Sequence, residues 1–544
     1  MSVEAFVQND SRHLERRLTS IYSRCLAWYL LAVAILWLTG IEGIYSHPTP
    51  FYAYLMPAFT TILIPAAVLA LMWLAYLIWQ NALFPLSPRR KGLTAAGVAL
   101  WVAAVGLIGW GVWRQAGAEG QSVAAVLAEV WRSLRWHLLA LAVFLASLGG
   151  WWWAMTHVPW FENELPKRAR RWMLTGLIAF SIVFPCSVAM IRDGAAGITA
   201  AYDRYQHEYV NDIGQGGSIR GLFRDYVKMH PYLSTHAKVH PPGPIVILWI
   251  LSFIAGRGAL GLSLATIAFG SLAIIPLYFW ARDLTNTRTA LTCCFLYALM
   301  PSIVLFTATS ADITFMPFTL TTLFLFWRAI HRRSVLYAAA AGALYAVLSL
   351  ISFSLIGLGA LFALVGLWRL RAPGLRLSVV QTALVMAAAF LLTHLAIRLW
   401  TGFDVIACFH ACKAQFDQDQ LNLDIFAPRY PGWVYRFFNP ACWLFFAGIP
   451  VSVLFIWRLA RPDADTKALF LVFAGTLIVL DILYLARGEG ERSAMYILPF
   501  MALPAAHLLD RIGLAARSCR PMLVTFAFLA VQTWLIETWL YTYW

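Results

Sequence analysis

Apolar and polar segments alternate along the whole chain, and apolar runs of about 17 to 25 residues recur from one end to the other. Runs of this length cross a bilayer as helices, and short polar turns separate them. The expected spans lie at about 25–44, 52–79, 94–114, 136–155, 172–191, 259–281, 289–307, 313–328, 335–350, 354–368, 377–399, 434–457, 467–485, 493–509 and 521–540. The pattern predicts an all-α polytopic membrane protein with about fifteen transmembrane helices.

Two segments break this pattern. The first is a polar island from Arg192 to His240, which begins directly after an apolar span and is rich in acidic, aromatic and histidine side chains. The second is the apolar run Gly243 to Ile254, which follows two prolines and is too short to cross a bilayer. We expect this run to form an interfacial or re-entrant helix, and the island to be the place where a membrane enzyme meets a water-soluble acceptor.

Composition and charge agree with this interpretation. The chain is 61% hydrophobic and 12% charged, which excludes a soluble globular protein. With the N-terminus in the cytoplasm, 25 of the 41 Lys and Arg residues fall on short inner segments, as the positive-inside rule requires. Topology therefore explains the net charge of +15 without nucleic-acid binding. We expect a multi-pass protein of the inner or plasma membrane, with the island and the active site on the extracytoplasmic side.

The island divides the chain into two parts. Residues 1–158 hold four expected spans and form an N-terminal membrane module. Residues 159–544 hold eleven spans and two substantial outer loops, at about 192–258 and 401–432. Because the polar sequence of the second part is concentrated in these loops, we expect its chemistry to lie between them.

Three residues at the outer membrane edge are candidates for chemistry. Asp193 follows an apolar span, where it could act as a general base or be an ordinary solvated carboxylate. His240 either ends the island or contacts phosphate, acceptor or a metal ion. Asp312 lies between two apolar spans, where an unpaired carboxylate is costly, and we expect it to be a supporting or metal-facing acid of the site.

Cationic and aromatic side chains complete the set of candidates. Arg492 precedes a span, and a guanidinium offers the planar fork of donors that suits phosphate, although arginine also occurs at membrane interfaces for structural reasons. Lys413 and Arg429 lie in the second outer loop, and Tyr202 lies in the island. Cys408 and Cys412 flank His410, but a closed zinc site needs four ligands and no second cluster stands nearby.

The second part resembles the GT-C class of lipid-dependent membrane glycosyltransferases, especially the protein O-mannosyltransferases and the lipid A aminoarabinose transferase. The motifs that carry the resemblance are Asp193 after the first core span, His240-Pro-Pro-Gly243, the sequence TATSAD that ends at Asp312, and GEGERSAMYILPF from Gly488 to Phe500. In the last motif, Arg492 and Tyr496 occupy the positions that are informative for the resemblance. The family often has Asp-Glu where this chain has Asp193-Gly194, and it often has a lysine that is absent from residues 348–359.

The resemblance implies a GT-C-like core with juxtamembrane helices in the first large outer loop. It also implies transfer of a sugar from a polyprenyl-phosphate carrier to an extracytoplasmic glycan, lipid or protein by an inverting displacement. Asp193 would be catalytic, and His240, Tyr202, Lys413, Arg429, Arg492 and Tyr496 would bind substrate. No cofactor is required by this chemistry, although a divalent metal ion between Asp312, Asp193 and His240 is compatible with it. The alternatives are a transporter or flippase of lipid-linked saccharides and a non-catalytic GT-C-like scaffold.

Overall fold

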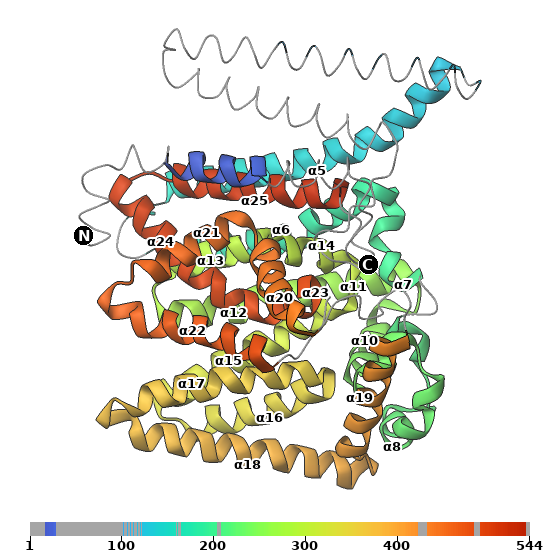
Figure 1. Cartoon of the computed structure of the whole chain (residues 1–544), viewed down its shortest axis with the longest axis vertical. Coiled ribbons are helices and arrows are strands. Elements are labelled where there is room, and N and C mark those ends of the chain that lie inside the picture. The colour runs from blue at the N-terminus through green and yellow to red at the C-terminus, as the bar shows by residue number, and fades with distance from the viewer. Residues whose placement is uncertain are drawn as a thin grey trace.

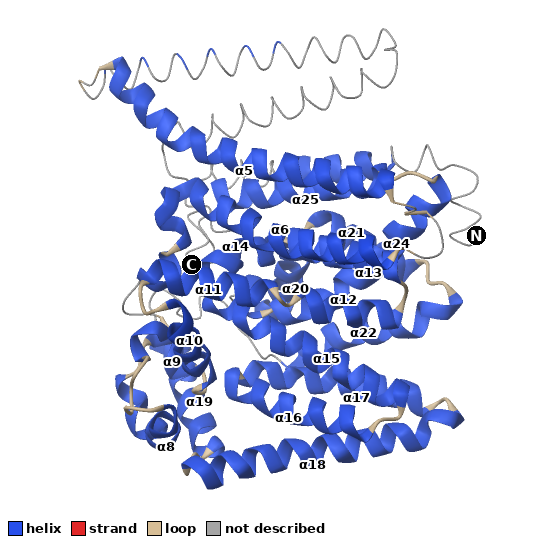
Figure 2. Cartoon of the chain, turned by 180° about the vertical axis from the view of Figure 1, so that it is seen from behind, coloured by secondary structure: helices blue, strands red, loops and turns tan. Residues whose placement is uncertain are grey.

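The computed structural model describes residues 17–28, isolated positions between 99 and 120, and residues 122–158, 160–161, 165–203, 208–422, 432–483 and 490–539. In these ranges the regular structure is helical (Figure 2). Residues 17–28 form a helix that packs against the end of the chain, where Tyr22 hydrogen-bonds Thr525 at 3.3 Å. The predicted all-α class is therefore confirmed for the described part.

Long apolar helices lie side by side and form the body of the molecule (Figure 1). Nine helices within the described ranges are long and apolar enough to cross a membrane, or up to eleven if two bent pairs are each counted as one span. The helices of the body are α5 (Val123–His157), α6 (Lys167–Asp193), α11 (Ala259–Ser271), α12 (Ile274–Leu284), α13 (Thr287–Leu299), α14 (Pro301–Thr309), α15 (Phe315–Arg332), α16 (Val335–Ile351), α17 (Leu358–Leu370), α18 (Arg376–Thr401), α20 (Gly432–Ala447), α21 (Ile449–Ala460), α22 (Ala464–Leu483), α24 (Leu498–Ala516) and α25 (Arg520–Trp539).

Each span predicted from 136–155 onward coincides with a helix or a bent pair of helices. The first three predicted spans lie mostly outside the described residues, so the total of fifteen and the four-span module 1–158 stay predictions. Two predicted spans differ in shape, and the run 289–307 forms α13 and α14 with a bend of 58° between them. The apolar run 434–457 forms two helices that meet at 111°, because Gly448 adopts a φ of +95° at the junction and Pro450 opens the second helix.

The island folds into a cap of short helices at one end of the body, beside α19 (Figure 1). The elements of the island are η1 (Gly194–Ile198), α7 (Ala200–Asp203), η2 (Tyr209–Asp212), α8 (Ile219–Met229), η3 (His230–Tyr232) and α9 (Thr235–Val239). The helix α10 (Gly243–Ala255) follows the island, and α19 (Val405–Asn422) comes from the second outer loop. Buried polar contacts hold this cap together. Ser234 donates to Asp212 at 2.6 Å, and Tyr226 donates to the carbonyl of His240 at 2.7 Å.

The short apolar run predicted after the two prolines is the 13-residue helix α10. Gly243 at its start lies so close to the end of α16 that an added Cβ would be 2.2 Å from the carbonyl oxygen of Leu350. Only glycine permits this approach, which fixes where α10 begins. Short segments link the remaining helices: η4 (Ala311–Thr314), η5 (Phe353–Gly357), η6 (Pro373–Leu375), α23 (Gly490–Ser493) and η7 (Met495–Ile497).

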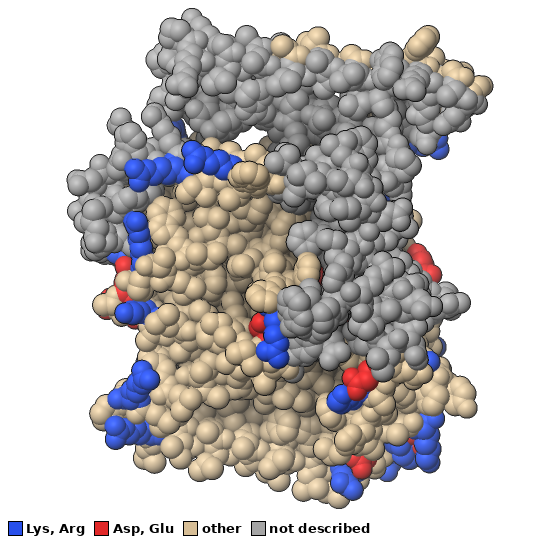
Figure 3. All heavy atoms as spheres, in the orientation of Figure 1, with Lys and Arg blue, Asp and Glu red and all other residues tan. Residues whose placement is uncertain are grey.

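Charged side chains gather at the two ends of the helical body. Figure 3 shows Lys and Arg along one edge, mixed acidic and basic side chains at the edge that carries the cap, and a mostly uncharged band between them. At the edge opposite the cap, carboxylates pair with arginines from different helices, as in Arg288–Asp510 at 2.6 Å and Arg328–Asp283 at 2.6 Å. The distribution is that of an integral multi-pass membrane protein.

Candidate active site at the outer end of the bundle

Asp193 is the last residue of α6, and its side chain is exposed. The helix ends here because Gly194 has a φ of +61°, a backbone conformation that glycine adopts most readily. The preceding residue, Arg192, donates to the carbonyl of Glu537 at 2.5 Å, and its Nε lies 3.9 Å from the Glu537 carboxylate. Glu537 also lies close enough to Asp193 for their charges to interact. Asp193 is thus a solvated carboxylate beside an Arg–Glu pair.

Asp312 and Arg492 form a buried ion pair at the same end of the bundle. Asp312 lies in η4, where its backbone N–H donates to the Ser310 hydroxyl at 3.2 Å. Its Oδ2 is 3.4 Å from Nε of Arg492, and the two side chains are 10% and 8% exposed. The other oxygen, Oδ1, is buried and has no hydrogen-bond partner in the part of the chain that the structure describes. The sequence identified both residues but could not show that they pair.

Tyr202 connects the island to α11. Its hydroxyl lies 2.6 Å from that of Thr266, which in turn donates to the carbonyl of Leu262 at 2.8 Å, so Tyr202 is the donor of the first bond. Burial raises the pKa of Tyr202, and the nearby carboxylates of Glu208 and Asp312 raise it further. The phenol is therefore protonated at neutral pH with its proton engaged. A substrate contact at Tyr202 would use the phenol oxygen as an acceptor, or the ring face.

His240 lies where the island, α15 and α19 meet. Its ring contacts Tyr209, with ring centroids 5.8 Å apart, and Phe315, with centroids 6.4 Å apart. Its carbonyl accepts hydrogen bonds from Tyr226 at 2.7 Å and from Cys412 Sγ at 3.3 Å. Because Phe315 follows Asp312 by one turn, these contacts place the histidine and the buried carboxylate in neighbouring parts of the site.

A buried Glu–His pair is a feature of the site that the sequence did not single out. His236 Nδ1 lies 3.5 Å from Oε1 of Glu208, and the two side chains are 8% and 5% exposed. Tyr209 lies against His236, with ring centroids 5.7 Å apart. Glu208 was one of several acids in the island, and nothing in its spacing distinguished it. Only the folded cap brings Glu208 close to Tyr202.

The second outer loop contributes α19, which packs on α8 and α9. Cys408 and Cys412 occupy its buried face with their sulfurs 3.9 Å apart, whereas His410 is exposed, so the three side chains do not converge. A hydrogen bond from Cys408 and a weaker effect of a hydrogen bond from His230 lower the pKa of Cys412 to about 6. Lys413 forms an ion pair with Asp417 on the exposed side of the helix. Arg429 lies outside the described residues.

Tyr496 follows Arg492 by one turn and is buried in η7. The structure therefore pairs Asp312 with Arg492 and places Tyr202 close enough to Asp312 and Glu208 for their charges to affect it. His240 contacts Phe315, which is one turn after Asp312. Asp193 has no hydrogen bond or ion pair to any of these residues. Among the described residues, no three His, Cys, Asp or Glu side chains converge as ligands of a metal ion. The suggested metal set of Asp312, Asp193 and His240 does not form such a group, and we assign no step to a metal.

Residues 239–397 match the family model described as dolichyl-phosphate-mannose-protein mannosyltransferase. The matched segment runs from the end of α9 into α18, so it contains His240 and Asp312 but neither Asp193 nor Arg492. The resemblance seen in the motifs is confirmed over this segment, and the matched family is one of glycosyltransferases. A comparison with curated proteins found no match for the chain.

Solved structures of membrane glycosyltransferases are similar to the chain. The oligosaccharyltransferase of Archaeoglobus fulgidus, with a tethered acceptor peptide that contains the NVT sequon, is 15% identical, with a TM-score of 0.45, over 68% of this chain and 55% of its own. ArnT from Cupriavidus metallidurans in the apo state is 16% identical, with a TM-score of 0.40, over 67% of this chain and 78% of its own. This chain thus spans about half the length of the archaeal enzyme.

Proposed function

We propose, from the match of residues 239–397 to the dolichyl-phosphate-mannose-protein mannosyltransferase family, that this chain is a membrane glycosyltransferase. The donor is a sugar on a polyprenyl-phosphate carrier, and the acceptor is an extracytoplasmic glycan, lipid or protein. The observation that carries the proposal is the buried pair of Asp312 and Arg492 beneath the island. A buried cation that is paired with a carboxylate is suited to bind a phosphate that enters from the bilayer.

In this proposal Arg492 binds the phosphate of the donor. The Asp312 carboxylate lies 3.4 Å from Nε of the guanidinium and attracts it by charge. As the bond between the sugar and the carrier breaks, negative charge grows on the phosphate, and a pre-oriented cation stabilises this charge without reorganisation. Because polyprenyl phosphate leaves as an anion, the reaction needs no general acid.

In this proposal Asp193 is the general base. Its carboxylate is exposed at the end of α6, where a polar acceptor can reach it from the outer side. The acceptor oxygen forms a bond to the anomeric carbon while its proton moves to Asp193, and the bond from that carbon to the phosphate oxygen breaks. One displacement of this kind inverts the anomeric configuration. His240 contacts Phe315, one turn after Asp312, and Tyr202 is held by Thr266 of α11; both are proposed to contact the substrates.

The proposal is tested with the purified full-length chain in liposomes. A labelled polyprenyl-phosphate sugar and an extract of candidate acceptors are supplied, and both transfer of the label and release of polyprenyl phosphate are measured. Release that depends on the acceptor supports a transferase. Movement of the intact lipid-linked sugar between leaflets without any release would instead identify a flippase.

A further inference from the structure

The indole of Trp136 lies against the backbone that follows the proposed base. Trp136 belongs to α5, and a Cβ added to Gly194 would lie 3.0 Å from Nε1 of Trp136 and 3.2 Å from its Cε2. Gly194 directly follows Asp193 and has a φ of +61°. The indole therefore covers the turn that ends α6, where a residue without a side chain fits best. A ring of α5 thus lies within one residue of Asp193.

Contacts between α5 and α25 hold Trp136 in this position. His137, the next residue, is buried, and its Nδ1 accepts a hydrogen bond from Nε1 of Trp534 at 3.0 Å. Trp534 precedes Glu537 by one turn of α25, and Glu537 contacts Arg192 of α6. These contacts join the ends of α5, α6 and α25, so the position of Trp136 relative to the end of α6 is fixed.

Two tryptophans and two arginines share one side of α5 near this point. Trp131 and Arg132 precede Arg135 and Trp136 by one turn, so the four residues form one face of the helix, the α5 face. The guanidinium of Arg135 lies 4.7 Å from the centroid of the Trp136 ring. Trp131 is 58% exposed, and both arginines are exposed. In Figure 1 the first turns of α5 extend beyond the end of α25 and away from the body.

The chemistry of the α5 face suits a saccharide that carries acidic groups. The apolar side of a sugar ring packs on an indole, and the indole N–H can donate to a hydroxyl. A guanidinium binds a carboxylate or phosphate through two parallel hydrogen bonds. The excess of Lys and Arg on inner turns does not account for Arg132 and Arg135, because both lie at the end of the bundle that carries Asp193.

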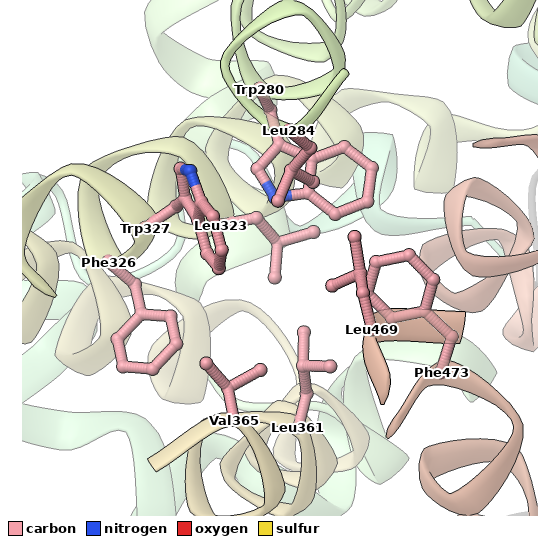
Figure 4. Close-up of a pocket in the computed structure, with 9 residues that line it drawn as sticks. All are labelled: Trp280, Leu284, Leu323, Phe326, Trp327, Leu361, Val365, Leu469 and Phe473. Carbon is pink, nitrogen blue, oxygen red and sulfur yellow. The ribbon is translucent and has the colours of Figure 1, made fainter. Parts of the chain in front are cut away.

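A hollow within the bundle differs from the α5 face. It lies between α12, α15, α17 and α22, and leucine, valine, phenylalanine and tryptophan side chains line it (Figure 4). Sugar hydroxyls need hydrogen-bond partners once they leave water, and such walls supply almost none. This hollow therefore does not suit a saccharide, whereas the α5 face offers both rings and charged donors.

We infer that the α5 face binds the acceptor of the transfer, and that this acceptor is a saccharide with acidic groups. The inference rests on the proposed function, because it takes Asp193 as the base. Acidic groups of the acceptor bind Arg132 and Arg135, its rings pack on Trp131 and Trp136, and its reacting hydroxyl reaches Asp193. Since α5 lies outside the matched residues 239–397, acceptor choice is set by a part of the chain that the family model does not include.

The acceptor KM of the full-length chain in phosphatidylcholine liposomes tests the inference. An envelope extract of the native host is treated with protease, and its water-soluble and lipid-linked saccharides are each divided by anion exchange into acidic and neutral pools. We expect transfer to an acidic pool, and the pool that is labelled shows whether the acceptor is free or lipid-linked. Arg135→Gln and Trp136→Ala should each raise the acceptor KM by about tenfold, with kcat and the donor KM unchanged.

Two further variants separate binding from folding. Trp136→Phe keeps an aromatic ring, so its acceptor KM should lie between those of the parental chain and Trp136→Ala. Trp152→Ala is the matched control, because it removes an exposed tryptophan at the other end of α5, and it should keep the parental acceptor KM. A parental acceptor KM in both Arg135→Gln and Trp136→Ala would overturn the inference while the transferase stands. So would transfer only to neutral saccharides, or only in extract that has not been treated with protease.

Binding of the labelled acidic pools without donor distinguishes failure of the inference from failure of the proposed function. The parental chain should retain more label than Arg135→Gln and Trp136→Ala. Retention with this difference, but without sugar transfer, would contradict the transferase and support the saccharide site. Retention no greater than that of empty liposomes would overturn the site.

Discussion

Nε of Arg492 lies 3.4 Å from Oδ2 of Asp312, and both side chains are buried at the end of the bundle that carries the island. The pair joins η4, between α14 and α15, to α23, which precedes α24 near the end of the chain. Removing one partner of a buried ion pair leaves the other charge without compensation, which is strongly destabilising. The two residues are therefore energetically coupled in the fold, whatever their part in binding a donor.

A double-mutant cycle measures this coupling. Arg492→Gln should lower the free energy of unfolding by about 3–5 kcal/mol because it leaves the Asp312 carboxylate buried and unpaired. In Arg492→Gln combined with Asp312→Asn neither charge of the pair remains, so the combined loss should be smaller than the sum of the single losses. Thermal unfolding in detergent gives the three values. Additive losses would show that the two side chains do not interact.

Substitution of Gly243 should disturb the packing of the start of α10 against α16. In Gly243→Ala the new Cβ would lie 2.2 Å from the backbone oxygen of Leu350, so α10 or the end of α16 must move. We expect a loss of about 1–3 kcal/mol, as for other overpacked sites. Gly258→Ala is the control, because no atom lies within 4 Å of its added Cβ. Equal melting temperatures for the two variants would contradict the close approach.

The contribution of Cys412 to stability should depend on pH. Hydrogen bonds from Cys408 and His230 lower the pKa of Cys412 to about 6, below the ordinary thiol value. A lowered pKa stabilises the fold most above the unfolded-state value, and the contribution is lost as the pH falls toward 6. The difference in melting temperature between the parental chain and Cys412→Ser should therefore shrink between pH 9 and pH 6. A difference that stays constant or grows over this range would contradict a lowered pKa for the Cys412 thiol.

The membrane orientation is tested by cysteine labelling in intact cells. Ala196 of the island and Gln418 of α19 are exposed at one end of the bundle, and Arg371 is exposed at the other. Ala196→Cys and Gln418→Cys should react with an impermeant maleimide added outside, because the inner turns carry the excess of Lys and Arg. Arg371→Cys should react only after permeabilisation. The reverse pattern would invert the topology and move the proposed site to the cytoplasm.

The lengths of the apolar runs were sufficient to predict most of the described helices, because membrane helices are long and uniform in composition. They could not predict the 111° turn within the run 434–457. A hydropathy window averages over Gly448, whereas the backbone there takes a positive φ that redirects the chain. The short helix α10 was predicted because length alone excluded a span.

The candidate site was predicted less completely. Asp193, Asp312 and Arg492 could be identified because each lies beside an apolar run in a motif that resembles the GT-C class, but the Asp312–Arg492 ion pair was not foreseen. The pairing depends on tertiary packing between distant segments. The contacts among Glu208, His236 and Tyr202 exist only in the folded cap, where neighbouring residues of the sequence point in different directions.

The central claim is that Asp193 is the base in a sugar transfer to an extracytoplasmic acceptor, and single-turnover transfer by Asp193→Asn tests it most directly. The amide keeps the shape of the side chain and removes its basicity, so donor binding should be retained while the transfer rate falls by about two to four powers of ten. Asp225→Asn, which changes a partly exposed carboxylate of α8 in the same island, should transfer sugar at the parental rate. A parental rate for Asp193→Asn, with polyprenyl phosphate still released, would contradict the account.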